Sequence, residues 1–209
     1  LYASLFHQCI AGPIVRYKDV NDDILHRQVK RSEVDRGITR FAVGLAKKAV
    51  LANGCAGIAD TLLATTPDAM AGIPALGVWL GGLAYMLQIY LDFSAYSDMA
   101  IGMGRIFGFK YPENFRLPYT SRSITEFWRR WHISLGTFFR DYVYIPLGGK
   151  KKHQLLNMAV VWALTGLCHG ASWNFVLWGL YFFVILAAEK TIGEKRLRRI
   201  PTILRRVGT

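Results

Sequence analysis

The chain has 209 residues, of which 52% are apolar, and its mean hydropathy is +0.22. This composition is too apolar for an ordinary soluble domain of the same length. A net charge of +12 would by itself suit either nucleic acid or a membrane surface. The basic side chains, however, are grouped around apolar runs: residues 105–153 carry ten basic and three acidic side chains, whereas residues 155–188 carry none of either kind. This grouping is typical of integral membrane proteins, so we expect no nucleic-acid partner.

The three cysteines, Cys9, Cys55 and Cys168, are far apart and lie in apolar surroundings. An odd number of isolated cysteines excludes a secreted disulfide scaffold, and we expect three free thiols. The sequence begins with Leu1 and shows no signal-peptide pattern, so we expect it to be the interior of a longer protein.

The first half of the chain mixes charged and apolar segments. Residues 14–40 carry seven basic and five acidic side chains and belong outside the hydrocarbon. An apolar pattern then runs from Ile38 to Leu63, but Lys47 and Lys48 interrupt it. Because lysines are costly in hydrocarbon, an interfacial or partly inserted helix fits this pattern as well as a full span does.

Residues 75–91 form a 17-residue run without a charged side chain, and the helix can continue to about Gly104. At about 1.5 Å per residue the run covers ~25 Å, close to the ~30 Å thickness of the hydrocarbon core. The run therefore predicts a transmembrane helix.

Polar side chains gather in the second half of that predicted helix. Gln88, Asp92 and Tyr96 share one face by their spacing of four residues, and Ser94 and Asp98 share another. Polar groups at this depth must meet protein or water. Hydrogen bonding between helices is the favoured interpretation, and a direct role of Asp92 and Tyr96 in binding substrate is the alternative.

Residues 123–145 predict an amphipathic helix at the membrane boundary. Ser123 and Glu126 have the spacing of a capping box at its start. Tryptophan and arginine are the residues typical of such boundary helices. The apolar stripe consists of Phe127, Trp131, Leu135 and Phe138 or Phe139.

Residues 155–188 would extend about 51 Å as one helix, far more than a bilayer needs. We therefore expect a break within residues 166–174, where Gly, His, Ser and Asn cluster, and a return to the starting side. The basic residues 190–209 would then meet the anionic cytoplasmic leaflet. Together, the segments predict an all-α, polytopic integral membrane protein with amphipathic interfacial helices and a broken or re-entrant helix at His169.

Two of the five histidines are candidates for chemistry. His169 lies fifteen residues into the uncharged run, where an ionisable side chain indicates function, although a structural histidine is the alternative. We expect His169 to be buried and neutral, and so able to accept a proton as a general base. His132 lies on the predicted amphipathic helix, and an anchor at the membrane interface is an equal alternative.

Other site chemistries lack their motifs. The sequence has no HxxxH, HxH or CxxC spacing, so we predict no metal site. Residues 170–174 read GASWN and depart from the hydrolase elbow, and residues 102–108 miss the third glycine of the dinucleotide fingerprint. We therefore expect no bound cofactor.

Several long motifs, in order, resemble the membrane-bound O-acyltransferase family, and within it most closely the alginate O-acetyltransferase branch. They are IAGPIVRY (10–17), LQIYLDFSAYSDMAIGMGRIFG (87–108), PENFRLPY (112–119), FWRRWHISLGTFFRDYVYIPLGG (127–149) and GLCHGASWNFVLWGLY (166–181). The resemblance covers nearly the whole chain and implies one catalytic region over residues 1–209. Members of the family have further transmembrane helices on both sides of this region, which we expect this sequence to lack.

The resemblance implies a multi-pass enzyme of the bacterial inner membrane that moves an acetyl group from cytoplasmic acetyl-CoA toward a sugar polymer outside. His169 matches the catalytic histidine of the family, and His132 matches the histidine of its Trp-His-(hydrophobic)-Ser-Leu motif. The expected partners are the polysaccharide acceptor, membrane lipid, and a periplasmic acetyltransferase or a polysaccharide export and modification complex.

The residues expected to bind substrate are Arg129, Arg130, Arg140, Asp141, Asp92, Tyr96 and Asn174. Arginines near the boundary would meet a CoA phosphate. Three alternatives stay open: a related enzyme that transfers D-alanine to teichoic acid, a solute transporter, and a non-enzymatic scaffold of an export complex. The absence of an inverted repeat counts against the transporter.

Overall fold

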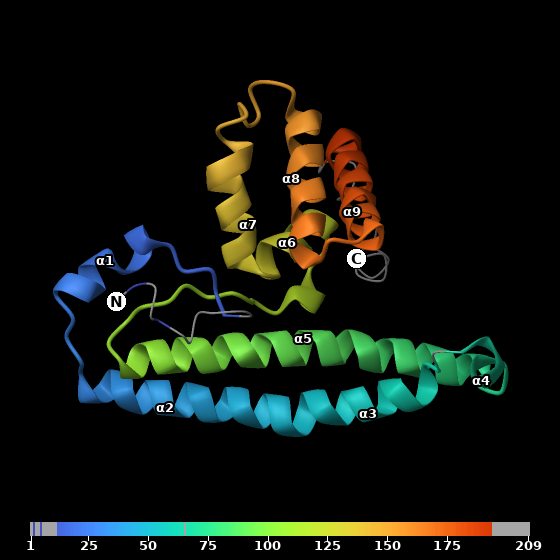
Figure 1. Cartoon of the computed structure of the whole chain (residues 1–209), viewed down its shortest axis with the longest axis horizontal. Helices are drawn as coiled ribbons and strands as arrows, with labels where there is room; N and C mark the ends of the chain where they lie inside the picture. The colour runs from blue at the N-terminus through green and yellow to red at the C-terminus, as the bar shows by residue number, and fades with distance from the viewer. Residues whose placement is uncertain (1, 3–4, 6–11, 65, 194–209) are drawn as a thin grey trace. The chain divides into compact units, whose positions relative to one another are not determined.

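The computed structural model describes residues 2, 5, 12–64 and 66–193, and the regular elements within these residues are all helical (Figure 1). The all-α prediction is therefore confirmed. Cys55 and Cys168 are free thiols, as predicted. Cys9 and the basic tail after residue 193 lie outside the described residues. The chain divides into two compact units, residues 1–113 and residues 114–209, each of which has its own internal packing.

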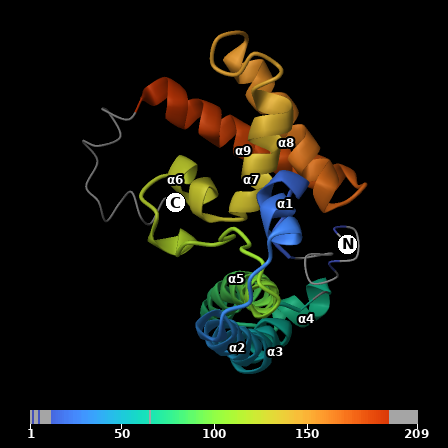
Figure 2. The ribbon, with the colours of Figure 1, turned by 90° about the vertical axis from the view of Figure 1, so that its left-hand side faces the viewer.

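The first unit contains one long pair of helices. Its elements are α1 (Tyr17–Leu25), α2 (Arg31–Ala46), the π-helical η3 (Lys47–Ala52), α3 (Asn53–Leu62), α4 (Pro67–Ala71) and α5 (Ala75–Ile106). The elements α2, η3 and α3 follow one another as a single 32-residue helix that lies along α5 (Figure 1). Figure 2 views this pair nearly end-on.

Both members of this pair are long and apolar enough to cross a membrane. The transmembrane helix predicted from residues 75–91 is thus confirmed as a helix of sufficient length, and it extends to Ile106. The earlier segment, for which a partly inserted helix was an equal expectation, has the length and composition of a full span.

Glycines allow the two long helices to approach each other closely. A Cβ atom added to Gly37 would lie 2.7 Å from the carbonyl oxygen of Gly102, and one added to Gly44 would lie 2.8 Å from that of Ala95. Since both obstructing atoms belong to the backbone, larger side chains would force the helices apart. Small residues at helix contacts are typical of membrane proteins.

The second unit consists of shorter helices and one helical hairpin. Its elements are η4 (Pro118–Thr120), α6 (Ile124–Arg130), α7 (Ile133–Phe139), the π-helical η5 (Arg140–Tyr144), α8 (Gln154–His169) and α9 (Trp173–Ile192). Helices α8 and α9 follow one another in the sequence, pack side by side and form this hairpin (Figures 1 and 2). The predicted break in residues 155–188 is confirmed, because the helix ends at His169 and a new one begins at Trp173.

The hairpin is held by backbone contact at glycines and by stacked aromatic rings. A Cβ atom on Gly166 would overlap the carbonyl group of Phe175, and one on Gly179 would overlap that of Trp162. The ring of Trp128 from α6 lies 4.8 Å from that of Trp162, between centroids, and 4.9 Å from that of Phe182. Helix α9 has the length and composition of a membrane span.

The prediction of one amphipathic helix over residues 123–145 is wrong. The structure has three pieces, and the chain breaks at His132, whose φ of 45° lies in the left-handed region. The predicted start is correct, since the Ser123 side chain accepts a hydrogen bond from the Glu126 backbone N–H. The Glu126 carboxylate, however, accepts from the backbone N–H of Arg122 and not from that of Ser123.

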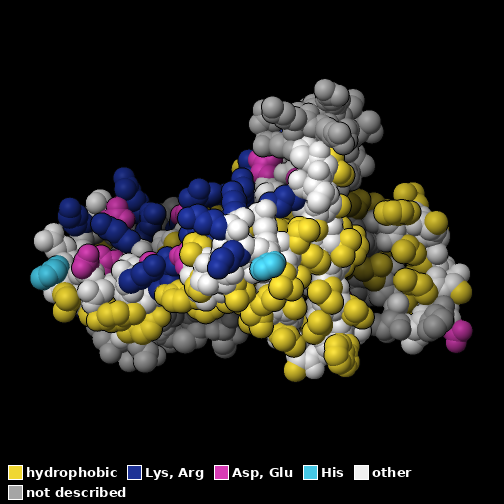
Figure 3. All heavy atoms as spheres, turned by 90° about the horizontal axis from the view of Figure 1, so that it is seen from above, with side chains coloured by type: hydrophobic (Ala, Val, Ile, Leu, Met, Phe, Trp, Pro, Cys, Tyr) yellow, Lys and Arg dark blue, Asp and Glu magenta, His cyan; other side chains and the backbone are white. Residues whose placement is uncertain are grey.

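Apolar side chains remain exposed on the outer faces of the long helices. On α5 they include Leu76, Trp79 and Leu83, and on α9 they include Trp173, Leu177, Tyr181 and Val184. Figure 3 shows wide areas of hydrophobic side chains on one face of the molecule. Exposed apolar surface of this extent suits contact with lipid or with further helices.

Candidate active site

His132 and His169, which are 37 positions apart in the sequence, line one small cavity in the second unit. This histidine cavity has a volume of about 180 Å³ and lies among α6, α7 and α8. The other lining residues are apolar, glycine or hydroxyl-bearing: Trp128, Trp131, Leu135, Gly136, Phe139, Val161, Trp162 and Thr165. The structure therefore brings together the two histidines that the sequence singled out.

His169 is the last residue of α8, and a backbone carbonyl fixes its tautomer. Its Nδ1 atom lies 2.7 Å from the carbonyl oxygen of Thr165, one helical turn earlier. A carbonyl oxygen can only accept, so Nδ1 carries a proton and donates it; in the neutral tautomer with this arrangement, the lone pair is on Nε2. The His169 ring also packs against Trp178, with 4.8 Å between ring centroids. This arrangement suits a proton acceptor.

The expectation that His169 is buried is wrong for the described chain. His169 is exposed there, because it ends α8 beside the short link of residues 170–172. The His169 ring is oriented by its hydrogen bond to Thr165 and its contact with Trp178, and not by burial.

His132 is held between α6 and α7 by a side chain from an earlier segment. Its Nδ1 atom lies 3.1 Å from Oδ1 of Asn114, which is completely buried. Oδ1 also accepts the backbone N–H of Ser134 at 3.2 Å, which identifies this atom as the amide oxygen. His132 therefore donates from Nδ1, as His169 does.

The pKa of His132 is lowered from 6.5 to about 4. Burial is the main cause, because it disfavours the charged imidazolium, and the neighbouring His169 contributes as a like charge. His132 is thus uncharged over the physiological pH range.

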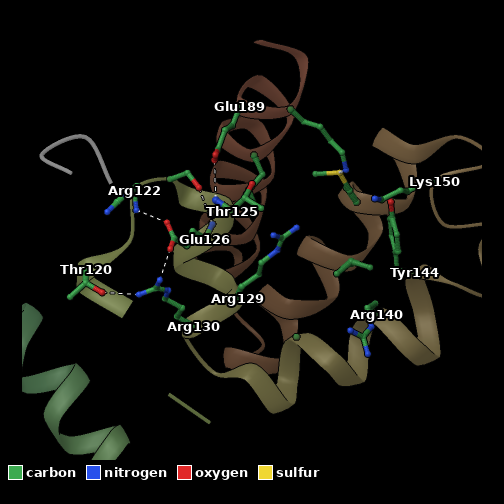
Figure 4. A pocket seen from close by; sticks show the side chains of 16 residues that line it. Thr120, Arg122, Thr125, Glu126, Arg129, Arg130, Arg140, Tyr144, Lys150 and Glu189 are labelled. Carbon is green, nitrogen blue, oxygen red and sulfur yellow. Dashed lines mark hydrogen bonds and ion pairs between the residues drawn. The ribbon is translucent and has the colours of Figure 1, made fainter. Parts of the chain in front are cut away.

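A larger cavity in the same unit collects the basic side chains. This basic cavity has a volume of about 1270 Å³, and Arg129, Arg130 and Arg140 are among its lining residues (Figure 4). Arg130 donates to Glu126 at 2.5 Å and to Thr120 at 2.8 Å. The surplus of basic over acidic lining side chains favours an anionic ligand.

The other predicted binding residues lie elsewhere. Asp141 forms an ion pair with Arg140 at 2.8 Å, and the residues lining either cavity do not include it. Asn174 is exposed in the first turn of α9 and also lines neither cavity. Asp92 and Tyr96 belong to α5 of the first unit. A direct binding role for these four residues stays a prediction.

Asp92 instead belongs to a set of ion pairs between the two long helices. Lys48 contacts Asp92 at 2.7 Å, and Lys47 contacts Asp98 at 2.5 Å. Lys47 also donates to Ser94 at 3.3 Å, so Ser94 and Asp98 share a face as predicted. These contacts agree with the favoured interpretation of polar bonding between helices.

Arg40 completes this set, which we call the ion-pair seam and which comprises Arg40, Lys47, Lys48, Asp92, Asp98 and Glu113. Arg40 donates to Asp98 at 2.9 Å and to Glu113 at 2.5 Å. Its guanidinium lowers the pKa of the Glu113 carboxyl by a direct hydrogen bond. Local sequence patterns give no sign of Arg40 or Glu113, because Arg40 bonds to Asp98 and Glu113 across 58 and 73 positions.

Asn114, Ser134 and Thr165 were also missed. Thr165 could have been found, since a residue four positions before a helical histidine presents its carbonyl nearby. Asn114 and Ser134 lie inside quoted motifs, but nothing in the local pattern shows that they meet.

A family model described as MBOAT, membrane-bound O-acyltransferase family, matches residues 1–202, so the chain belongs to this family. The chain is 46% identical over 198 residues to the probable alginate O-acetylase AlgI of Azotobacter vinelandii, covering 91% of this chain and 38% of that protein. It is 39% identical over 204 residues to the peptidoglycan O-acetyltransferase of Helicobacter pylori, covering 93% and 37%. It is 32% identical over 200 residues to the teichoic acid D-alanyltransferase of Bacillus subtilis, covering 89% and 50%. The chain therefore spans half or less of the length of these relatives.

Proposed function

We propose that the protein to which this chain belongs transfers an acetyl group to hydroxyls of an extracytoplasmic polysaccharide such as alginate, with His169 as the general base. The observation that carries this proposal is the histidine cavity, where His169 has its Nδ1 proton committed to Thr165 and its lone pair on Nε2. The similarity to O-acetylating relatives supports the same reaction class.

The chemistry follows from the weakness of an alcohol as a nucleophile. His169 accepts the hydroxyl proton at Nε2 as the oxygen bonds to the thioester carbonyl carbon. The carbon–sulfur bond then breaks, and the proton passes to the leaving thiolate. General-base help of this kind typically contributes about 10²–10⁴ in rate. Backbone N–H groups at the start of α9 would stabilise the negative oxygen of the intermediate.

The donor that fits this reaction is acetyl-CoA or another acyl thioester. Its phosphates would bind in the basic cavity, whose lining includes Arg129, Arg130 and Arg140. The donor would enter from the cytoplasm, and the polysaccharide from the other side of a bacterial inner membrane that the whole protein crosses several times. Passing the acetyl group onward would involve a periplasmic acetyltransferase or a polysaccharide export complex.

D-alanyl transfer to teichoic acid is the second candidate, because that relative is 32% identical to this chain over the 200 aligned residues. Acetyl transfer is preferred, since the O-acetylating relatives are 46% and 39% identical to this chain over the aligned residues. Membership of an acyltransferase family also makes a transporter or a scaffold the weaker alternatives.

The test replaces His169 by Gln and by Ala in the full-length protein and measures the O-acetyl content of the exported polymer. We expect acetylation to be lost, while the amount of protein in the membrane and the amount of polymer stay unchanged. His26→Ala is the matched control, because His26 is an exposed histidine at the end of α1. Wild-type acetylation in both His169 variants would show that His169 is structural.

A further inference from the structure

Asn114 stands out because it is fully buried and one of its atoms meets three donors. Its side chain has 0% exposure, and its Oδ1 atom accepts from the Ser134 hydroxyl at 2.9 Å and from the Ser134 backbone N–H at 3.2 Å. The third donor is Nδ1 of His132, at 3.1 Å. An amide oxygen has two lone pairs, so three donors on one such oxygen share its accepting capacity.

The backbone around Asn114 makes the same connection. The Asn114 carbonyl accepts the backbone N–H of Ile133 at 3.0 Å, and the Arg130 carbonyl accepts the backbone N–H of Arg116 at 2.9 Å. The segment of residues 114–116 is therefore hydrogen-bonded to the chain on both sides of His132. These bonds accompany the left-handed backbone of His132, a conformation that is costly for a residue with a side chain.

The ring of His132 is fixed from a second direction. Phe115 stacks on it, with 6.5 Å between ring centroids and 23° between ring planes. Phe115 is in turn held edge-on by Trp131, with centroids 5.1 Å apart. The imidazole is thus restrained in position by Phe115 and in rotation by the bond to Asn114.

From these contacts we infer that Asn114 is the positioning residue for His132: it fixes the tautomer with the proton on Nδ1 and orients the ring in the histidine cavity without adding a charge that would favour the imidazolium. This inference rests on the proposed function, which places the reaction at that cavity.

The choice of an amide has a chemical reason. A carboxylate at the same place would accept the same three donors but would favour the imidazolium form of His132 by its charge. A positive charge there would make His169 a weaker base, because His169 is the titratable group that acts on His132 across the cavity. The other described residues that line the cavity carry no charge. A neutral acceptor therefore orients His132 without charging it.

The experiment compares Asn114→Asp and Asn114→Leu in the full-length protein in lipid. Solid-state nitrogen NMR of histidine-labelled protein reports the tautomer and charge of His132, and its signal is assigned by its loss in His132→Gln. In the wild type we expect a neutral ring with the proton on Nδ1 at pH 7. In Asn114→Asp the midpoint of His132 protonation should move about one to three pH units higher.

Kinetics provide the second readout. Leucine has a similar size to asparagine but accepts no hydrogen bond, so Asn114→Leu should lower kcat about 10–100-fold with little change in the KM for the thioester donor. Asn157→Leu is the matched control, because Asn157 is a buried asparagine whose amide donates to the carbonyls of Gly149 and Lys152. Its NMR signature for His132 should match the wild type.

Each outcome decides the inference. An unchanged His132 midpoint in Asn114→Asp, or a wild-type kcat in Asn114→Leu, would overturn it. Loss of both Asn114 variants from the membrane would mean that Asn114 serves folding alone, and would overturn it too. If the wild type lacked acyl-transfer activity, the proposed function would fail while the NMR comparison still tested the position of His132.

Discussion

The two units of this chain treat ionisable side chains in opposite ways. In the first unit, the ion-pair seam places lysine and arginine from one long helix against carboxylates from the other and from the segment after it. In the second unit, His132 and His169 each donate to a neutral oxygen, and the described residues that line their cavity include no carboxylate.

The difference distinguishes polar groups that hold helices together from polar groups that can transfer a proton. Charges that are paired within apolar helices satisfy one another and have little capacity left for a substrate. Neutral imidazoles with one nitrogen committed keep a lone pair on the other for proton transfer. The seam thus has the character of a helix contact, and the histidine cavity that of the proposed reaction site; the changes below test how each unit is held together and how it titrates.

The largest effect is expected at Asp98, which both Arg40 and Lys47 contact. Asp98→Leu leaves two cations without this anion between apolar helices. Removal of one partner of a buried ion pair typically costs about 3–5 kcal/mol. We expect a large fall in the thermal unfolding midpoint of the purified full-length protein.

The double variant Lys47→Met/Asp98→Leu is the control for the Asp98 prediction. It replaces a pair by apolar side chains of similar length and should recover a large part of the lost stability. Equal instability of the single and double variants would show that Asp98 acts through something other than Lys47.

Features that depend on neighbouring residues could be predicted from the sequence, whereas contacts between distant helices could not. The helix at residues 75–91, the break near His169 and the cap at Ser123 each depend on neighbouring residues, and all three were predicted. The functions of Lys47 and Lys48 could not be settled in the same way. Their carboxylate partners lie on α5, and a hydropathy pattern cannot show which helix will pack alongside.

The break at His132 could not be predicted from the sequence for a similar reason. Residues 123–145 have a helical stripe of apolar side chains, so periodicity predicts one helix. The interruption depends on bonds to Asn114 and Arg116, which approach from an earlier segment. Tertiary hydrogen bonds of this kind override local preference and leave no periodic signal. The motif resemblance still identified both histidines, because it does not depend on helix continuity.

The second prediction concerns the uncharged α8–α9 contact. Gly179→Ala introduces a Cβ atom that overlaps the Trp162 carbonyl, so the hairpin must open. Overpacking typically costs about 1–3 kcal/mol, and a backbone obstruction belongs near the upper end. The loss of stability is measured by thermal unfolding of the full-length protein.

Gly57→Ala in α3 is the control for crowding at Gly179. No atom of the described residues outside its own helical turn lies within 4 Å of a Cβ at Gly57. Alanine should therefore raise stability by about 0.5–1 kcal/mol through its better helix propensity. Equal effects of the two alanines would contradict close contact between α8 and α9.

The third prediction uses pH to distinguish the cavity from the seam. The pKa of His132 is about 4 in the folded chain and 6.5 without the fold, so the unfolded chain binds a proton first as the pH falls. Stability from this group is fully present above pH 6.5 and is lost as the pH falls toward 4. Between pH 7 and pH 5 we expect a loss of about 2 kcal/mol.

His132→Gln removes this titration and should flatten the stability curve between pH 7 and pH 5. Glu113 has a lowered pKa because of Arg40, so the stability it contributes is lost only at more acidic pH, below the ordinary glutamate value of 4.5. An equally steep curve for His132→Gln would show that another group causes the loss.

The smallest effect is expected at Lys48, which lies next to Lys47 but in a more open position. The side chains of Lys48 and Asp92 are 41% and 34% exposed, against 21% and 20% for Lys47 and Asp98. A half-exposed pair contributes about 0–1 kcal/mol, because each charge keeps much of its solvation. Lys48→Met should therefore lower the unfolding midpoint much less than Lys47→Met does, and it should leave acetyl transfer unchanged if Asp92 is a structural residue.

Both adjacent lysines carry the same charge, so the pair of variants isolates the effect of burial. A drop in acetyl transfer in Asp92→Asn and not in Lys48→Met, at equal protein stability, would instead assign Asp92 to substrate binding and contradict the separation between the seam and the histidine cavity.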